Sequence, residues 1–378
     1  MRKIFLYISL LMLGLLLILA LVLRLRFGGG SPYPDLSTSP AFSESTLEEV
    51  LSFPEPLGNI AVSADGRIFF TVHPESRPTG PTVLEITNGQ TAPYPSETKQ
   101  SLFKTVLGLC IDEQNRLWTI DHGNHGLDPV RLLAFDLSTN EIVHDYAFTP
   151  SIAPIGSFFN DFSISPDGQW IYIADVNFFG KKPALIVYDI ENKRARRLLE
   201  NHTSIASQDY IIETPLKKMT FLGGLIALKP GIDGIVVNTK GDYLYYGAMT
   251  HDGLYRIATS DLQDEGLRPT ELADRIERVG TKPLSDGLSI DTLDQVYITD
   301  VEHGGIARME PDGTLKTLIK APERVRWADG CSFGPDGYLY FTDSAIPDQM
   351  LRSKSHMKAA APYFIYRFKP DHAGTPGR

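Results

Sequence analysis

The stretch that decides the fold runs from Asn160 to Asp175 and reads NDFSISPDGQWIYIAD. Apolar residues alternate with other residues on both sides of Ser165-Pro166-Asp167-Gly168, and alternation interrupted by Pro-Asp-Gly is typical of a β-hairpin. Proline presets φ for a turn, and glycine accepts the positive φ that other residues resist. Because an isolated hairpin is only marginally stable in water, the fold depends on whether this pattern recurs.

The pattern recurs six times along the chain. Each copy has a strand of small residues, a turn, an aromatic-rich second strand and a third strand, and the copies begin at Gly58, Leu107, Asn160, Asp233, Asp286 and Asp329. Repeats of about 45 residues with three or four short strands each are typical of propeller blades, which bury their faces against one another. The sequence therefore predicts an all-β fold over residues 51–370. This fold is a six-bladed β-propeller of four-stranded antiparallel blades, with an insertion around Asn201 to Leu228.

The N-terminus predicts a membrane segment. Met1-Arg2-Lys3 precedes an uncharged apolar run from Ile4 to Leu23, and twenty helical residues cover about 30 Å, the thickness of a bilayer core. No good cleavage site precedes Gly28, so we expect an uncleaved signal anchor over residues 1–26. Residues 27–50 are rich in Gly, Ser and Pro and are expected to be a flexible tether. The body of the chain is then periplasmic or at the cell surface, membrane-anchored or else secreted.

Composition excludes several function classes. The net charge is -10 and the one basic patch is Lys193 to Arg197, so nucleic acid is not an expected partner. The sequence contains no phosphate-binding glycine loop, GxSxG, HExxH or CxxC motif, which argues against nucleotide-dependent and serine-hydrolase chemistry. Cys110 and Cys331 fall in blades that are not neighbours, and we expect two buried thiols in a monomeric protein.

The starts of the inner strands carry polar residues that a propeller would bring to its axis. Carboxylates that face one channel repel each other unless a cation, water or protonation relieves them, and oxygen ligands suit Ca²⁺ or Mg²⁺. One interpretation is a shared ligand site with a divalent cation held by Asn160, Asp286 and Asp233. The other is that each Asp-Gly only starts a strand, with the carboxylate bonded to its own turn. The residues in question are Asn160, Asp161, Asp233, Asp286 and Asp329.

Second-strand ends lie at the same rim as inner-strand starts in an up-and-down blade. Four of them are aspartates with an expected structural role in packing, for example a bond to the backbone of a neighbouring blade: Asp121, Asp175, Asp300 and Asp343. Histidines follow these ends, and His122 and His303 are candidate ligand contacts, with a bland loop position as the alternative. Four phenylalanines near the third blade could wall an apolar pocket, or could instead fold onto the blade: Phe158, Phe159, Phe178 and Phe179.

Several longer phrases resemble one known family. Arg116-LWTIDHG followed by Arg131-LLAFDL, and Ser285-DGLSIDTLDQVYITDVEHGGI, are similar to phrases of the major royal jelly/yellow proteins, including bacterial members. The resemblance extends over roughly residues 55–368. It implies a six-bladed propeller, an extracytoplasmic location and small-molecule binding in some animal members, and some insect members are linked to dopachrome chemistry. It supplies no catalytic residue set.

A more distant resemblance is to gluconolactonase/regucalcin-type propellers. That family holds a divalent metal at the mouth of the central channel with Asn and Asp at inner-strand starts, where this chain has Asn160 and Asp286. Its first blade supplies a Glu, where this chain has Gly58-Asn59.

Three functional hypotheses follow. The first is a protein that binds a small cyclic or aromatic ligand in the central mouth. The second is a metal-assisted lactonase or tautomerase-like isomerase, in which an ion such as Ca²⁺ polarises a carbonyl. The third is a cell-envelope interaction scaffold without a small ligand, since a fold does not fix a function.

Overall fold

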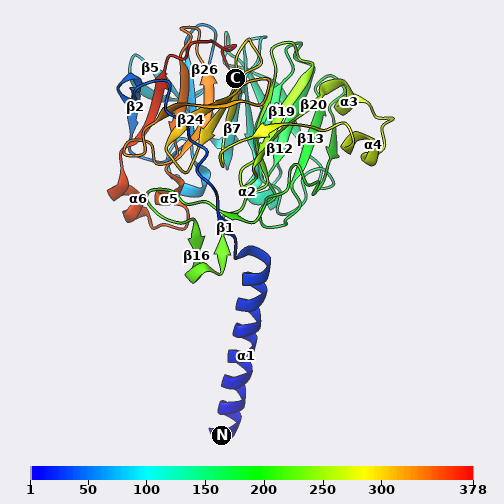
Figure 1. Ribbon diagram of the computed structural model, residues 1–378, viewed down its shortest axis with the longest axis vertical. Helices are drawn as coiled ribbons and strands as arrows, with labels where there is room; N and C mark the ends of the chain where they lie inside the picture. Colours follow the sequence, from blue (N-terminus) through cyan, green and yellow to red (C-terminus); the bar gives the residue numbers. More distant parts are fainter. Residues whose placement is uncertain (1, 378) are drawn as a thin grey trace.

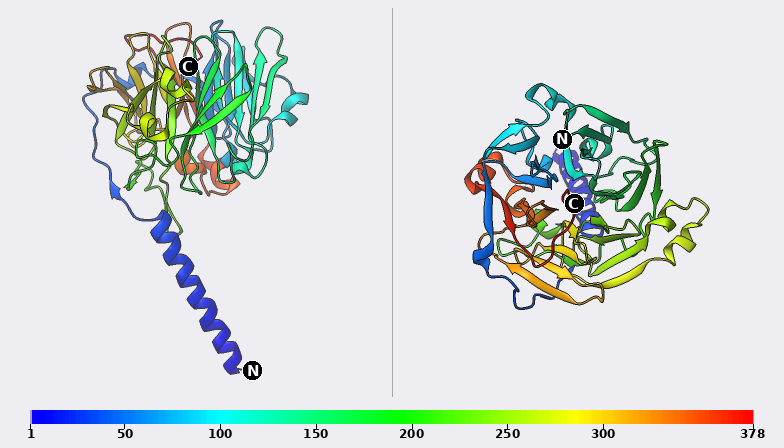
Figure 2. Two further views of the ribbon diagram at one scale, coloured as in Figure 1. Left: turned by 90° about the vertical axis from the view of Figure 1, so that its right-hand side faces the viewer. Right: turned by 90° about the horizontal axis from the view of Figure 1, so that it is seen from above.

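The computed structural model describes residues 2–377 and shows six sheets arranged in a ring, with one long helix projecting from it (Figure 1). Each sheet has four antiparallel strands in an up-and-down order. Viewed along the ring axis, the sheets surround a common centre (Figure 2). The predicted six-bladed propeller is confirmed.

The strands of each blade follow one another outward from the axis. Blades one to three consist of β3 (Leu57–Val62), β4 (Ile68–Val72), β5 (Val83–Thr87) and β6 (Gln90–Pro93); β7 (Val106–Ile111), β8 (Arg116–Asp121), β9 (Arg131–Asp136) and β10 (Ile142–Ala147); and β11 (Phe159–Ile164), β12 (Trp170–Asp175), β13 (Ala184–Asp189) and β14 (Arg194–Leu198). Blades four and five consist of β18 (Ile232–Val237), β19 (Tyr243–Ala248), β20 (Gly253–Ala258) and β21 (Glu277–Thr281), and of β22 (Leu288–Ile290), β23 (Val296–Asp300), β24 (Gly305–Met309) and β25 (Leu315–Lys320).

The sixth blade joins the two ends of the propeller. Its first three strands are β26 (Ala328–Phe333), β27 (Leu339–Asp343) and β28 (Tyr363–Phe368), and its outer strand is β2 (Glu48–Phe53) from the start of the chain. β2 pairs with β28 from Glu48↔Arg367 to Phe53↔Tyr363. Strand pairing therefore begins at Glu48, slightly before the expected boundary at residue 51. The segment expected as a tether lies along blade five, where the Phe42 backbone N–H donates to the Leu318 carbonyl at 2.9 Å.

Apart from the N-terminal helix, helices are few and short and lie in the segments that connect strands. The predicted N-terminal apolar helix is α1 (Arg2–Phe27), of which Lys3–Phe27 is long and apolar enough to cross a membrane. The remaining helices are short: α2 (Gly123–Gly126), α3 (Thr259–Gln263), α4 (Pro269–Ala273), α5 (Ile346–Gln349) and α6 (Lys354–Ala360), with 3₁₀ turns η1 (Glu44–Thr46), η2 (Pro74–Ser76), η3 (Glu97–Leu102) and η4 (Leu222–Gly224). The predicted insertion between blades three and four contains β15 (Tyr210–Ile211), β16 (Thr220–Phe221) and β17 (Ile226–Ala227), and β15 pairs with β1 (Ser31–Pro32).

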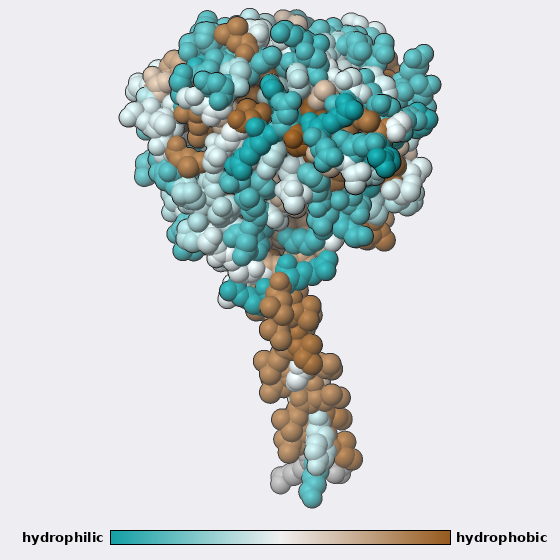
Figure 3. Space-filling model, turned by 45° about the vertical axis from the view of Figure 1, so that its right-hand side comes forward, coloured by the Kyte–Doolittle hydropathy of each residue, from teal (hydrophilic) through white to brown (hydrophobic). Residues whose placement is uncertain are grey.

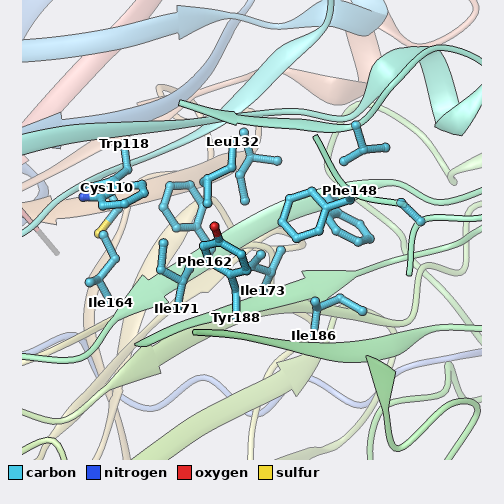
Figure 4. Close-up of a cluster of buried hydrophobic side chains, with 14 of the residues drawn as sticks. Cys110, Trp118, Leu132, Phe148, Phe162, Ile164, Ile171, Ile173, Ile186 and Tyr188 are labelled. Carbon is cyan, nitrogen blue, oxygen red and sulfur yellow. The ribbon is translucent and has the colours of Figure 1, made fainter. Parts of the chain in front are cut away.

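The core is divided into clusters between adjacent blades, because each sheet buries its faces on its two neighbours. Figure 4 shows the cluster between blades two and three, where Trp118 and Leu132 meet Phe162 and Tyr188. Aromatic rings also pack edge to face there, with Phe148 and Phe159 at a centroid distance of 5.0 Å. Such contacts stabilise the fold beyond the stabilisation that comes from the area the rings bury.

Neighbouring inner strands approach closely at the axis, because a glycine without a side chain stands where one strand meets the backbone of the next. A Cβ placed on Gly287 would lie 2.4 Å from the Asp329 carbonyl oxygen, and one on Gly330 would lie 2.3 Å from Asn59 Oδ1. Pairing with the second strand is shifted at this point in five of the six inner strands, as in a β-bulge. Blades one and three carry Asn59 and Asp161 in place of this glycine, and Asn59 Nδ2 donates to Asp161 Oδ1 at 2.7 Å.

The far end of the channel is covered by the C-terminal segment. The Gly377 carbonyl accepts from the Ile111 backbone N–H at 3.1 Å, and the Gly377 N–H donates to the Phe333 carbonyl at 3.2 Å. A space of only about 30 Å³ remains beneath it, bordered by Cys110 and Cys331. Both cysteines are buried and neither forms a disulfide, as predicted. The channel is therefore narrow at this end and has room for about one water molecule.

Replacing Gly287 by Ala should destabilise the propeller, because the added methyl group would collide with the backbone of blade six. We expect Gly287→Ala to lower the free energy of unfolding by about 1–3 kcal/mol. The matched control is Gly80→Ala, where a Cβ would meet nothing within 4 Å. Urea unfolding of both variants measures the difference, and equal stability of the two would contradict the close-approach argument.

Candidate functional site

A cavity of about 320 Å³ lies at the end of the channel where the inner strands begin. This volume is at the lower end of the range for small-molecule sites. Its walls are largely apolar, and their aromatic members are Phe158, Phe178, Phe179, Phe221 and Trp327. The cavity is therefore suited to a small ligand with apolar surface.

The insertion between blades three and four builds one wall of the cavity. Phe221, Ile226 and Leu228 line the cavity from this segment. Leu228 and Phe221 pack in a hydrophobic cluster that includes Met249 and Trp327. The walls thus come from loops of several blades, which a rigid ring holds in place.

The floor of the cavity is polar and buried. Asn160, Asp233, Asp286 and Asp329 line it, each with no more than 5% of its surface exposed. Asn160 Nδ2 donates to Asp233 Oδ1 at 2.5 Å, the side chains of Asp233 and Asp286 are hydrogen-bonded to each other, and Trp327 Nε1 donates to Asp286 Oδ2 at 2.6 Å. Asn160 Oδ1 is buried without a hydrogen-bond partner, so the floor offers an unused acceptor.

Burial and mutual repulsion change the protonation of these carboxyl groups. Burial and the charge of Asp286 raise the pKa of Asp233 and of Asp329 well above the ordinary value. Burial also raises the pKa of Asp286, but only to about 6, because Trp327, Asp233 and the buried Lys282 favour its anion. At neutral pH the floor therefore carries its negative charge on Asp286, and protonated neighbours reduce the repulsion.

One side of the cavity carries a separate polar group. His125 Nε2 and Glu75 Oε1 are 2.9 Å apart, and His73 Nδ1 accepts from the Glu75 backbone N–H at 3.2 Å. Burial lowers the pKa of His73 to about 4, so this imidazole is neutral near pH 7. His125 has a left-handed backbone with φ of 58°, a conformation that non-glycine residues adopt rarely and that clusters at functional sites.

The family model described as "Major royal jelly protein" matches residues 104–325, which is more than half of the chain. The chain belongs to the major royal jelly protein family. It is 28% identical over 170 residues to major royal jelly protein 9 of Apis mellifera, covering 41% of this chain and 36% of that protein. It is 30% identical over 204 residues to major royal jelly protein 2 of the same species, covering 48% and 42%. The matched region thus spans about two fifths of these curated relatives.

Solved structures with the same architecture show how far the fold extends beyond the royal jelly family. A luciferin-regenerating enzyme covers 88% of this chain and 97% of its own at a TM-score of 0.57 and 12% identity. A calcium-binding regucalcin from Agrobacterium tumefaciens covers 90% and 100% at 0.55 and 12%. A gluconolactonase from Xanthomonas campestris covers 90% and 98% at 0.55 and 14%. At these identities the likeness shows the fold alone.

Five polar residues were predicted to meet where the inner strands begin, and the structure brings four of them together. Asn160, Asp233, Asp286 and Asp329 line one cavity, whereas Asp161 borders the narrow channel below it. Among residues 2–377, no group of three or more His, Cys, Asp and Glu side chains is arranged to hold a metal ion. The set expected for a cation, Asn160, Asp233 and Asp286, has only two such members, so it stays a prediction.

Three other candidate residues, Phe159, His122 and His303, lie outside the cavity wall. Phe159 packs in the core between blades two and three, while Phe158 lines the cavity, because successive strand residues point to opposite sides. His122 is buried behind the wall against the Phe158 ring, at a centroid distance of 4.3 Å. His303 lies away from the cavity, with Nδ1 3.0 Å from Asp300 Oδ2.

The aspartates at second-strand ends have structural partners, although in their own blade rather than in the neighbouring one. Asp121 accepts from the backbone N–H groups of Lys104 and Thr105 at 2.6 and 3.0 Å. Asp343 accepts in the same way from Arg326 and Trp327 at 3.1 and 2.9 Å. These bonds fit the expected structural role, and they are made within the blade because the loop entering each inner strand passes the end of its own second strand.

Several cavity residues were not found from the sequence. Trp327 and Glu75 come from loops whose length and course the repeat pattern does not define. Trp327 did carry a signal, since it lies two residues before Asp329 at the start of the sixth copy.

The raised pKa of Asp286 predicts a pH dependence of stability. An aspartate that titrates near 3.8 when unfolded and near 6 when folded destabilises the protein once both states ionise. Its contribution is therefore most favourable below about pH 4 and is lost as the pH rises through 6. We expect Asp286→Asn to raise stability relative to the unmodified chain by about 2–3 kcal/mol at pH 8, with little gain at pH 4.

Thermal unfolding between pH 4 and pH 8 checks this prediction. The control is Asp274→Asn, an exposed carboxyl that follows α4. A gain for Asp286→Asn that does not change with pH would show that Asp286 is not the titrating group.

Proposed function

We propose that this protein is a membrane-anchored, extracytoplasmic member of the royal jelly family that binds a small cyclic or aromatic ligand in the central mouth. The proposal depends on one observation: an apolar cavity ends in a buried floor with an anion at Asp286 and an unused acceptor at Asn160 Oδ1. A buried acceptor without a partner carries a cost that a ligand donor would relieve.

The polarity of the floor selects among ligands. Asn160 Oδ1 and the Asp286 carboxylate both favour a hydrogen-bond donor, and Asp286 favours a positive one. Phe158 and Phe179 can pack against an aromatic or cyclic body. An amine or hydroxyl attached to a ring meets both demands, whereas a carboxylate ligand would be repelled by the floor.

Matched small molecules test this preference. We expect 2-phenylethylamine to raise the melting temperature of the full chain, and 3-phenylpropionate to leave it unchanged. At a ligand concentration of 100 times Kd the stabilisation is about 2.7 kcal/mol. Asp286→Asn should weaken amine binding by about tenfold or more, as expected for loss of a hydrogen bond to a charged group.

Trp327→Phe sharpens the test, because it keeps an aromatic wall but removes the donor to Asp286. Losing that donor raises the pKa of Asp286 further, so amine affinity should fall at pH 6 and recover at pH 8. Equal binding of amine and carboxylate, or no effect of Asp286→Asn, would exclude the proposed orientation.

A second candidate function is metal-assisted hydrolysis of a lactone or isomerisation of a carbonyl compound. The unpartnered Asn160 Oδ1 is what favours it, because this oxygen lies beside Asp233 and Asp286 in the same floor. These three residues would hold a divalent cation such as Ca²⁺, which would supply polarisation of a carbonyl. The pair formed by His125 and Glu75 lies in the same cavity and could move a proton.

Calorimetry with Ca²⁺ and Mg²⁺ alone separates the two candidates. If the floor holds a cation, Ca²⁺ should bind with release of protons at pH 7, because Asp233 must ionise to become a ligand. Asn160→Ala and Asp233→Asn should each abolish that binding. If neither Ca²⁺ nor Mg²⁺ binds, the metal-assisted candidate is eliminated, and the proposal of amine binding still stands.

A further inference from the structure

The cavity opens on the face of the propeller from which α1 projects. In Figure 1, α1 extends from the side of the ring that carries α2, α5, α6 and β16, and the C-terminal end of the chain lies on the opposite side. The lateral view in Figure 2 shows the same arrangement. The far end of the channel is covered by the segment that ends at Gly377. A ligand therefore enters the described structure from the α1 side.

Direct contacts fix the end of α1 against this face. Arg24 Nη1 donates to the Gly224 carbonyl at 2.6 Å, and Lys229 Nζ donates to the Gly28 carbonyl at 2.9 Å. The rings of Phe27 and Phe178 are 5.9 Å apart, and Phe178 lines the cavity. Lys3–Phe27 covers about 37 Å as a helix, enough to cross the hydrocarbon core of a bilayer. Its surface is apolar, in contrast to the propeller (Figure 3).

The same face carries most of the large apolar side chains that the propeller exposes. Outside α1, six of nine such residues lie in loops at this end of the blades, so the apolar surface is concentrated where the helix ends. They are Leu127, Ile155, Phe179, Leu216, Leu222 and Leu351. Phe179 and Leu351 also line the cavity, so the apolar surface continues into its entrance.

Basic side chains accompany this apolar surface, although the chain as a whole has a net charge of -10. Lys181 Nζ lies 5.4 Å from the Phe27 ring centroid and 4.5 Å from that of Phe178. Lys182 and Lys218 are exposed in neighbouring loops, where they pair with Glu200 at 3.8 Å and with Glu213 at 3.1 Å. Together with Arg24 and Arg26 in the last turn of α1, Lys181 places basic groups at the end of the membrane helix, a position suited to the level of lipid phosphates.

We propose that the face around the cavity entrance lies on the surface of the bilayer that α1 crosses, and that a lipid-soluble ligand enters the cavity directly from the membrane. This inference rests on the proposed anchor and ligand site and adds the source of the ligand. Exposed apolar side chains gathered at one end of a soluble domain indicate an interaction surface, and here ring contacts from Phe27 through Phe178 to Phe179 link them to the membrane helix. Loops at this depth would bury their leucines among acyl chains while the propeller stays in water.

Single cysteines carrying an environment-sensitive dye test the docked orientation in the full chain. Cys110 and Cys331 are buried, so the unsubstituted chain measures the background labelling. Labels are placed by Leu222→Cys and Ile155→Cys on the proposed face, by Leu293→Cys in the turn between β22 and β23 at the opposite end, and by Leu11→Cys in α1. The chain is reconstituted in vesicles of phosphatidylcholine and phosphatidylglycerol with brominated acyl chains as quencher.

We expect strong quenching at positions 222 and 155, as at position 11, and none at 293. Quenching at 11 without quenching at 222 and 155 would overturn the docking inference and leave the anchor standing. A blue shift at 222 and 155 without quenching by brominated lipid would indicate a protein partner or a second copy, and would also overturn it.

Ligand uptake gives a second readout. Ile155→Asp combined with Leu222→Asp changes exposed residues that do not line the cavity. This variant should bind 2-phenylethylamine from water as the unmodified chain does, but should take up a long-chain alkyl derivative of that amine from vesicles more slowly. Equal rates of uptake from vesicles by the two proteins would contradict entry from the membrane. If the unmodified chain does not bind 2-phenylethylamine from water, the ligand site itself is refuted.

Discussion

Contact between backbones at the axis is the constraint on which the structure depends. Neighbouring inner strands come so close that a methyl group on Gly287 or Gly330 would collide with the next blade. This approach lets each blade bury its faces on its neighbours, and the interblade clusters follow from it. Where the glycine is replaced, by Asn59 and Asp161, the two side chains narrow the channel and bond to each other.

The same close approach creates the chemistry of the cavity. The residue before each axial glycine is forced toward the mouth, and in blades four, five and six that residue is an aspartate. Three carboxyl groups in one buried floor cannot all be ionised, so protons are retained and one anion remains at Asp286. A ring of repeats thus produces an acidic floor, and unrelated loops add the apolar walls above it.

The repeat made the ring and most of the floor predictable from the sequence. Period-two alternation around turns such as Ser165 to Gly168 located the blades, and Asn160, Asp233, Asp286 and Asp329 followed from their equivalent positions. The outer strand of blade six was not predictable in this way, because β2 comes from the other end of the chain. Of the four phenylalanines near the third blade, Phe158, Phe178 and Phe179 line the cavity, whereas Phe159 packs into the core because adjacent residues of an extended chain face opposite sides. Trp327 and Glu75 depend on tertiary contacts between loops, which a repeat pattern does not contain.

The position of β2 also has a consequence for biosynthesis. This strand follows α1 closely in the chain, yet its hydrogen-bonding partner β28 is the last strand of the described residues and is made after all the other strands of the propeller. During translation the nascent sheets therefore have an open edge until the ribosome has passed Phe368. If α1 is already held in the translocation machinery by then, the first and last parts of the polypeptide are joined beside the site of insertion, and the cylinder closes there as a late event of maturation.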